Sequence, residues 1–386
     1  MNVAKIIICL CMLYIFLPMV NVSGTDGLPA GFDSLIDNSE VEQYWDYIGE
    51  EYRHVLPDWD KEKLWATVKG DTTISMKEWF VAALHYLFYE IAENGKLLAT
   101  LLLLTLFCIL LQTIQNAFEK KVVSKVAYSI VYIMLIILAM QSFYLAATYV
   151  VDTIKLTENF LIALLPLLLG VLASLGHLVS VSFFHPMIIL LIHVSVFTVS
   201  RIVIPLFLVS AILQMVSTIS SEHKATKLAN LIKNLAISLM GILLTVFLGV
   251  ISVQGTVSAI QDGIAMRAAK FVTGNFIPVI GRIFTDATDT VLSATMLVKN
   301  AIGVVGVIIL IAIVLFPAIK IFVLSLMYKI TTALLQPIGD GPIIECLDII
   351  GKHILYLFAA LLLVTFMFFF TIVILMMLSN VTMMVR

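Results

Sequence analysis

Apolar residues dominate the chain from Leu97 almost to its end, and they are grouped in runs of membrane-crossing length. A helix needs about 20 predominantly apolar residues to span the hydrocarbon layer. The clearest runs are residues 97–115, 126–151, 235–253 and 354–378. This pattern predicts an all-α fold: a polytopic transmembrane helical protein with seven to nine spans, preceded by a short N-terminal extracytoplasmic helical region.

The stretch from residue 160 to residue 220 leaves the number of spans open. It can form three short spans with bends near Gly176, Pro186 and Pro205, which we favour, or one span with re-entrant hairpins. Proline removes a backbone donor and clashes with the preceding turn, so it predicts a kink or a break. The charged residues within 152–158 predict a short outer loop before this stretch.

Polar residues return in residues 254–300, between two apolar regions. This segment is too polar for an ordinary span and too apolar for a solvated linker. It therefore predicts amphipathic helices, bent at Gly274–Asn275 and at Pro278, that lie at the outer face or dip into the protein interior.

The C-terminal region contains a second ambiguity in span number. Residues 301–315 and 321–335 form either two short spans or one long broken helix, with Pro317 and Lys320 at the break. A polar loop is predicted over residues 336–352, before the last span.

The first 24 residues have the pattern of an export signal. Lys5 precedes an apolar run over residues 6–19, and small residues suitable for cleavage follow it. The alternative is an anchor that is retained. Both interpretations place the segment that follows outside the cytoplasm.

That following segment is an acidic head with a helical pattern. Ser39 with Glu42, and Ser75 with Glu78, have the spacing of capping boxes. Each pair precedes apolar residues three and four positions apart, which predicts a helix with one apolar face. The second helix ends near residue 94, and it either lies along the membrane surface or packs within the head.

Charge separates these regions and orients the spans. The net charge of −2 combines a net of −8 over residues 24–80 with a net of +6 over residues 97–386. Lysines cluster at 116–125 and 222–233, which predicts that these two loops are cytoplasmic. The predicted organisation is a signal (1–24), the acidic extracytoplasmic helical head (25–95), a first transmembrane group (96–253), an amphipathic broken-helix segment (254–300) and a C-terminal transmembrane group (301–386).

Candidate functional positions are those that place a charge or a backbone break within the membrane region. The charged candidates could line a polar path, and a proline–glycine break frees backbone groups that need neighbours or water. Arg201 is either buried and paired, or near a turn at Pro205 from which it extends to the interface. The candidates are Arg201, Pro278, Gly281, Asp286, Asp289 and Lys320.

Catalytic and metal-binding signatures do not emerge from the sequence. His177, His185 and His193 recur every eight residues, so on one helix each lies about 80° further around the axis, and no metal site is predicted. Of the four cysteines, two belong to the signal, Cys108 lies in a span and Cys346 in the polar loop. The chain has no phosphate-binding loop, zinc-protease motif or nucleophile elbow. We therefore predict a protein that is not an enzyme and uses no cofactor.

The order of these parts resembles the stage III sporulation protein AE family. The most specific segments are Asn-Phe-Ile-Pro-Val-Ile-Gly at 275–281, Asp-Ala-Thr-Asp-Thr-Val-Leu-Ser at 286–293, the Gly303-x-x-Gly306 start of a span, and Leu-Gln-Pro-Ile at 335–338. The likeness covers essentially the whole chain.

The resemblance implies a multipass protein of the mother-cell membrane that surrounds the forespore. It implies a channel-like complex with other stage III sporulation proteins and with stage II sporulation protein Q, required for forespore development. The family is described as permease-like, so a self-contained secondary transporter of a small solute is the alternative. The lipid bilayer is a further partner, and no nucleic acid is implied.

Overall fold

The computed structural model describes residues 40–52, 76–117, 122–219, 225–276, 280–339 and 341–384, and these residues are all-α, as predicted. The elements in chain order are α3 (Glu40–Glu51), α5 (Met76–Glu93), α6 (Gly95–Ala117), α7 (Val122–Ser174), α8 (Leu178–Thr198), the π-helix η2 (Val199–Val203), α9 (Ile204–Ile219), α10 (Thr226–Phe276), α11 (Ile280–Leu335) and α12 (Pro342–Met384).

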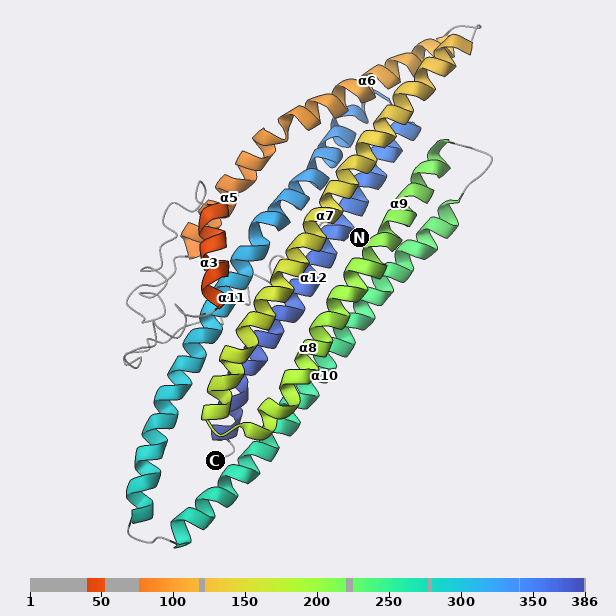
Figure 1. Ribbon diagram of the computed structural model, residues 1–386. Helices are drawn as coiled ribbons and strands as arrows, with labels where there is room; N and C mark the ends of the chain where they lie inside the picture. Colours follow the sequence, from red (N-terminus) through yellow and green to blue (C-terminus); the bar gives the residue numbers. More distant parts are fainter. Residues whose placement is uncertain are drawn as a thin grey trace.

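The long helices form an elongated bundle whose neighbours run up and down along one axis (Figure 1). α8, η2 and α9 follow one another without a gap and make a single rod. The 53 residues of α7 and the 56 residues of α11 correspond to about 80 Å and 84 Å at ~1.5 Å per residue. The rods are therefore far longer than the hydrocarbon layer of a bilayer, which is about 30 Å thick.

α11 is the central helix of the bundle. Of its most apolar stretch, 72% is buried, compared with 22% for that of α6. Glycines allow close approach here, since a Cβ at Gly303 would lie 2.4 Å from the Met376 side chain of α12 and a Cβ at Gly306 would lie 2.5 Å from the Leu164 side chain of α7. Small residues have this role at the interfaces of membrane helices.

The number of spans differs from the prediction. The described residues contain six helical segments long and apolar enough to cross a membrane, fewer than the seven to nine predicted. Pro166, Pro186 and Pro317 lie inside α7, α8 and α11 without ending them. Neighbouring helices can compensate for the hydrogen bond that proline removes, so proline is a poor marker of span ends. The segments are Gly95–Ile114, Val126–Ser174, Leu178–Thr218, Thr226–Ile264, Ala294–Leu335 and Pro342–Leu378.

Of the boundaries predicted within residues 152–220, the structure contains only the bend near Gly176. Residues 152–158, predicted to be an outer loop, are an interior part of α7, and the chain turns at Gly176, which has a φ of 87°. Such a backbone conformation favours glycine. Residues 160–174 complete α7 and residues 178–219 form one rod, so the three short spans that we favoured are not formed.

The predicted breaks in the C-terminal half are also corrected. α10 continues through Gly274 and Asn275 without a bend, while Pro278 lies outside the described residues. α11 passes Pro317 and Lys320 as one unbroken helix. The predicted loop 336–352 is largely helical because α12 begins at Pro342, which is a favourable residue for a first turn. Cys346 consequently lies buried in α12.

The head packs against the side of the bundle. The ring of Tyr52, which follows α3, stacks on Phe316 of α11 at 4.1 Å, and Tyr44 meets Phe160 of α7 edge to face at 5.4 Å. α5 contacts α11 and joins α6 at Asn94, whose amide donates to the side chain of Glu90. The two helices predicted for the head are confirmed over the described residues. The signal region lies outside those residues.

Candidate functional site: a buried centre and a charged band

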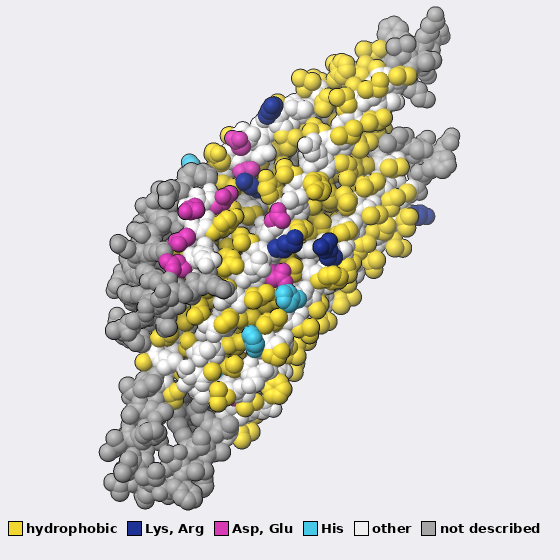
Figure 2. Space-filling model, in the orientation of Figure 1, with side chains coloured by type: hydrophobic (Ala, Val, Ile, Leu, Met, Phe, Trp, Pro, Cys, Tyr) yellow, Lys and Arg dark blue, Asp and Glu magenta, His cyan; other side chains and the backbone are white. Residues whose placement is uncertain are grey.

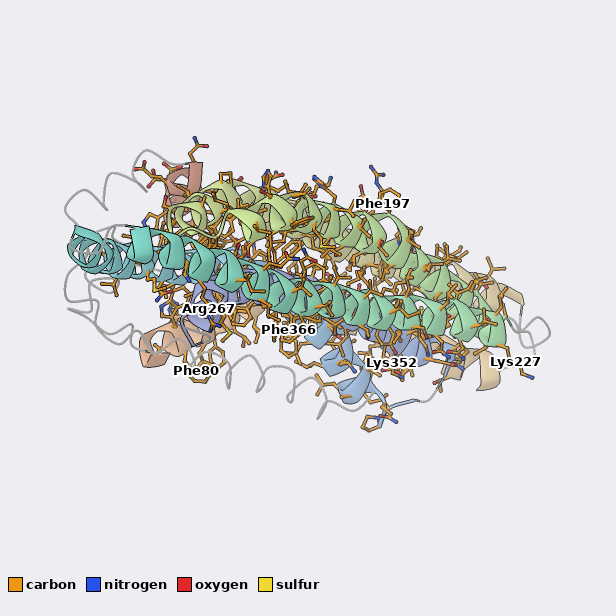
Figure 3. All side chains as sticks on the ribbon, turned by 90° about the horizontal axis from the view of Figure 1, so that it is seen from below. Phe80, Phe197, Lys227, Arg267, Lys352 and Phe366 are labelled. Carbon is orange, nitrogen blue, oxygen red and sulfur yellow. The ribbon has the colours of Figure 1, made fainter. Side chains whose placement is uncertain are left out.

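One end of the bundle collects the turns that lysines flank, and we name it the lysine end. It holds the end of α6, the start of α7, the α9–α10 turn and the α11–α12 turn (Figure 1). Tyr132 of α7 bonds there to Thr218 of α9 at 2.5 Å, and its hydroxyl donates to the carbonyl of Pro342 at 3.4 Å. Lys227 lies at this end and Arg267 towards the other (Figure 3). The described residues on either side of the two loops predicted to be cytoplasmic, 116–125 and 222–233, therefore lie at the same end of the bundle.

A charged band crosses the bundle about halfway along it. We define it by Asp152 and Lys155 of α7, Arg201 of η2 and Lys320 of α11. The first three are exposed, and the ammonium group of Lys320 lies 5.6 Å from the centre of the Tyr149 ring, one turn before Asp152. Figure 2 shows charged side chains crossing the middle of this face, with hydrophobic side chains on both sides. A charge at the bilayer centre costs about 2.5–3.5 kcal/mol on insertion scales, so this band requires water or protein.

Arg201 occupies a local irregularity of the rod. The π-helix Val199–Val203 precedes Pro205, which cannot donate to the carbonyl four residues earlier. The widened turn accommodates this missing hydrogen bond, and such turns are frequent at functional sites. The sequence left two interpretations of Arg201, a buried and paired residue or a residue near a turn at Pro205. The structure fits neither of them, because Arg201 is exposed and lies within the continuous α8–α9 rod.

A buried centre lies in the half of the bundle away from the lysine end, where the α7–α8 turn meets α10. His177 and Asp262 are 2% and 1% exposed, and the distance from His177 Nδ1 to Asp262 Oδ2 is 3.1 Å. Ser180 donates its hydroxyl to Asp262 Oδ2 and its backbone N–H to Oδ1 at 3.4 Å. The carboxylate thus satisfies donors at the start of α8, where a helix favours negative charge.

The electrostatics of the buried centre favour a neutral histidine. Burial lowers the pKa of His177 below its ordinary value. The hydrogen bond and the charge of Asp262 oppose this shift, whereas the positive charge of Lys299 lowers the pKa further. Lys299 of α11 is itself buried, and its ammonium group donates to the carbonyl of Met376 in α12 at 2.5 Å. Lys299 thus links α11 to α12, while the bonds of Asp262 link α10 to the start of α8.

The buried centre is not a catalytic triad. In a Ser-His-Asp triad the histidine lies between serine and carboxylate, so that it can take the hydroxyl proton. Here the Ser180 hydroxyl and the His177 ring both bond to the same oxygen of Asp262. The histidine is therefore not placed to take the proton of the serine hydroxyl. The three residues are suited to holding a charge and fixing the α7–α8 turn.

A second buried histidine lies nearer the lysine end. His353 of α12 is 3.2 Å from the Ser210 hydroxyl of α9 through Nε2, and 2.8 Å from the Ile349 carbonyl through Nδ1. Ser210 donates in turn to the carbonyl of Ala229 in α10. This cluster joins α9, α10 and α12 through hydrogen bonds.

The remaining candidate residues are only partly described. Gly281, Asp286 and Asp289 lie in the first turns of α11, whose side chains there are outside the described part of the structure, as is Pro278. Lys320 and Arg201 both lie in the charged band. The described residues contain no group of three or more His, Cys, Asp or Glu that could hold a metal ion.

Sequence reasoning missed the buried centre. The sequence pattern groups His177 with His185 and His193, whereas its partner lies 85 residues away on another helix. Asp262 lies within residues 254–300, whose polar pattern predicts only amphipathic helices. One feature of the sequence could have identified Asp262, because it is an isolated carboxylate in the apolar first part of residues 254–300. Such a residue in a membrane protein is usually paired or functional.

Comparisons with known proteins give the family. The model of the stage III sporulation protein AE family matches residues 59–379. Stage III sporulation protein AE of Bacillus subtilis (strain 168) is 51% identical over 351 residues, which cover 91% of this chain and 88% of that relative. No solved structure matches the chain. With a family model over most of its length and a relative at this level of identity, the chain belongs to the stage III sporulation protein AE family.

Proposed function

We propose that this protein is a non-enzymatic membrane subunit of a channel-like or secretion-like sporulation complex in the mother-cell membrane around the forespore, required for forespore development. Its partners in this proposal are other stage III sporulation membrane proteins and stage II sporulation protein Q. The chain belongs to a sporulation family, which supports the setting but does not identify the complex.

The observation that carries the proposal is the charged band on the outside of a bundle whose helices are otherwise continuous and apolar. Asp152, Lys155 and Arg201 are exposed on adjoining rods, and lipid tolerates such groups poorly. A subunit of a larger assembly can cover them with protein or keep them beside a water-filled path. The solute sites of secondary transporters typically lie at broken helices, whereas α7, α8 and α11 continue through their prolines.

A self-contained transporter remains the alternative because of the buried centre. Ionisable residues inside a membrane bundle often mark solute or proton pathways, and His177, Asp262 and Lys299 are all buried. The two proposals differ in what the purified chain can do alone. Only a transporter would move solute without other subunits.

Two measurements separate these functions. The first is co-purification of the tagged chain from sporulating Bacillus subtilis in which it replaces the stage III AE relative, followed by mass spectrometry. We expect other sporulation membrane proteins to be recovered. The unmodified chain is compared with a variant that carries both Asp152→Ser and Arg201→Ser. This variant should reach normal levels in the membrane, but we expect less of the other sporulation membrane proteins to co-purify with it. The second is solute flux into vesicles that contain only this chain, and flux above that of empty vesicles would overturn the proposal.

A further inference from the structure

The lengths of the rods raise the question of which part lies in the bilayer. α7 and α11 extend over about 80 Å and 84 Å, while the hydrocarbon layer is about 30 Å thick. An upright bilayer would therefore surround less than half of either rod. Since both halves of the exterior carry hydrophobic side chains, as Figure 2 shows, apolarity alone does not select one.

On α7 and on the α8–α9 rod, the distance from the level of the α9–α10 and α11–α12 turns to the charged band is about one bilayer thickness. Tyr132 lies at the level of the α9–α10 and α11–α12 turns through its bonds to Thr218 and Pro342. Asp152 follows Tyr132 by 20 residues on α7, which is about 30 Å along the helix. On the neighbouring rod, Arg201 precedes the end of α9 at Ile219 by 18 residues, or about 27 Å.

The first transmembrane helix starts with a charge on the far side of this level. A Cβ at Gly339 or at Gly341, on either side of the α11–α12 turn, would lie 3.1 Å from the Ile109 side chain or 3.3 Å from the Gln112 side chain of α6. Lys96, at the start of α6, precedes these two residues by 13 and 16 positions, or about 20–24 Å. Most of the apolar stretch of α6 is exposed on the bundle surface.

Lysines between these two levels extend towards the lysine end. Lys233 of α10 donates to the Asn230 side chain, and Lys352 of α12 pairs with Asp348. Both partners lie nearer the start of their helix, and both helices start at the lysine end. This is the direction in which a lysine side chain would extend to reach the nearest interface.

The head lies beyond the charged band. Its contacts are with Phe160, which follows Asp152 along α7, and with Phe316, which precedes Lys320 along α11. Both contacts are therefore further from the lysine end than the band itself. α3 exposes the carboxylates of Asp46, Glu50 and Glu51 at this level. Three exposed acidic groups on one short helix are incompatible with hydrocarbon around them.

We propose that the bilayer surrounds only the half of the bundle between the lysine end and the charged band. The other half, which includes α8, the later part of α10 and the early part of α11, stands outside the lipid on the same side as the head. In this placement the charged band lies at the membrane–water boundary. The lipid-facing surface consists of α6, the first half of α7, α9 and the first half of α10. This inference does not depend on the identity of any partner.

The first test uses the unmodified protein, because all four tryptophans precede residue 80. The full chain is placed in vesicles of phosphatidylcholine with bromine at the centre or near the top of the acyl chains, and tryptophan fluorescence is measured. We expect little quenching by bromine at the bilayer centre. The control Leu103→Trp adds a tryptophan at an exposed position of α6, nearer the middle of the proposed layer, and should be quenched by central bromine. Equal and strong quenching of the native tryptophans by central bromine would overturn the placement.

The second test compares two positions on the α8–α9 rod. Phe183 and Val209 are exposed hydrophobic residues on either side of Arg201. Each is replaced by cysteine in full-length protein whose native cysteines are changed to alanine, and a nitroxide label is attached. We expect the label at Val209→Cys to be reached by oxygen and shielded from a nickel chelate, as in lipid. The label at Phe183→Cys should show a much lower ratio of oxygen to nickel accessibility. The same lipid-like ratio at both positions would contradict the proposal.

Discussion

Two groups of charged residues occupy very different surroundings in this bundle. The buried centre, formed by His177, Ser180, Asp262 and Lys299, lies inside, and its polar groups are held by hydrogen bonds between helices. The charged band lies on the outside, where Asp152, Lys155 and Arg201 are exposed. In the interior, ionisable groups must find partners within the fold, and they connect helices. On the exterior they depend on what surrounds the protein.

The difference predicts unequal consequences of mutation. Leaving a buried donor or acceptor without its hydrogen-bond partner typically costs about 1–3 kcal/mol for each group. Surface substitutions usually change stability by less than about 0.5 kcal/mol. Mutations in the buried centre should therefore act on folding, whereas mutations in the charged band should act on assembly.

The largest effect is expected for Asp262→Leu. It leaves three buried donors, two of Ser180 and one of His177, without their acceptor. Since each unsatisfied donor costs about 1–3 kcal/mol, we expect the free energy of unfolding to fall by more than about 3 kcal/mol. Denaturant titration of the purified protein in detergent measures this change. Asp152→Leu is the matched control, because that carboxylate is exposed, and it should change the free energy by less than about 0.5 kcal/mol. Equal losses in the two variants would remove the distinction between the two groups.

A smaller loss is expected for Ser180→Ala. A hydrogen bond to a charged group contributes about 1.5–3 kcal/mol, and this change removes the hydroxyl donor to Asp262 while keeping the backbone N–H. Ser182→Ala is the control on the same helix, since its exposed hydroxyl bonds only to the Leu178 carbonyl of its own helix. The same titration should show little change for this control. An unchanged stability of Ser180→Ala would mean that the serine contributes nothing to holding the carboxylate.

A third prediction concerns pH. Because burial lowers the pKa of His177 in the folded protein, the unfolded chain takes up a proton near pH 6.5 that the folded protein resists. The contribution to stability is thus fully present above about pH 6.5 and is lost as pH falls towards the lower folded pKa. One proton gives a slope of at most about 1.4 kcal/mol per pH unit.

His177→Gln should flatten this dependence, which thermal unfolding between pH 8 and pH 5.5 would show. His185→Gln in α8 is the control for the loss of an imidazole ring, since His185 is exposed. A slope that is the same in His177→Gln and in the unmodified protein would show that His177 does not titrate in this range.

The sequence predicted those parts of the fold that follow from local patterns. The helices at residues 97–115 and 354–378 and the two described head helices were predicted correctly, because the length and spacing of apolar residues act locally. The breaks at Pro317 and at Gly274 were wrong, since packing by neighbouring helices decides whether such a residue ends a helix. The pairing of His177 with Asp262 depends on which rods adjoin, and a single sequence does not contain that information.

The smallest effect on stability is expected for Arg201→Leu, a change in the charged band. Its side chain is exposed in η2, so the free energy of unfolding of the isolated protein should change by less than about 0.5 kcal/mol. If the charged band is covered by another subunit, the same change should still reduce co-purification of other sporulation membrane proteins. Arg201→Lys should retain part of this recovery, since it keeps the charge but not the planar guanidinium group. A normal recovery with Arg201→Leu would indicate that Arg201 only faces water at the membrane boundary, and a large loss of stability would indicate that it belongs with the interior group.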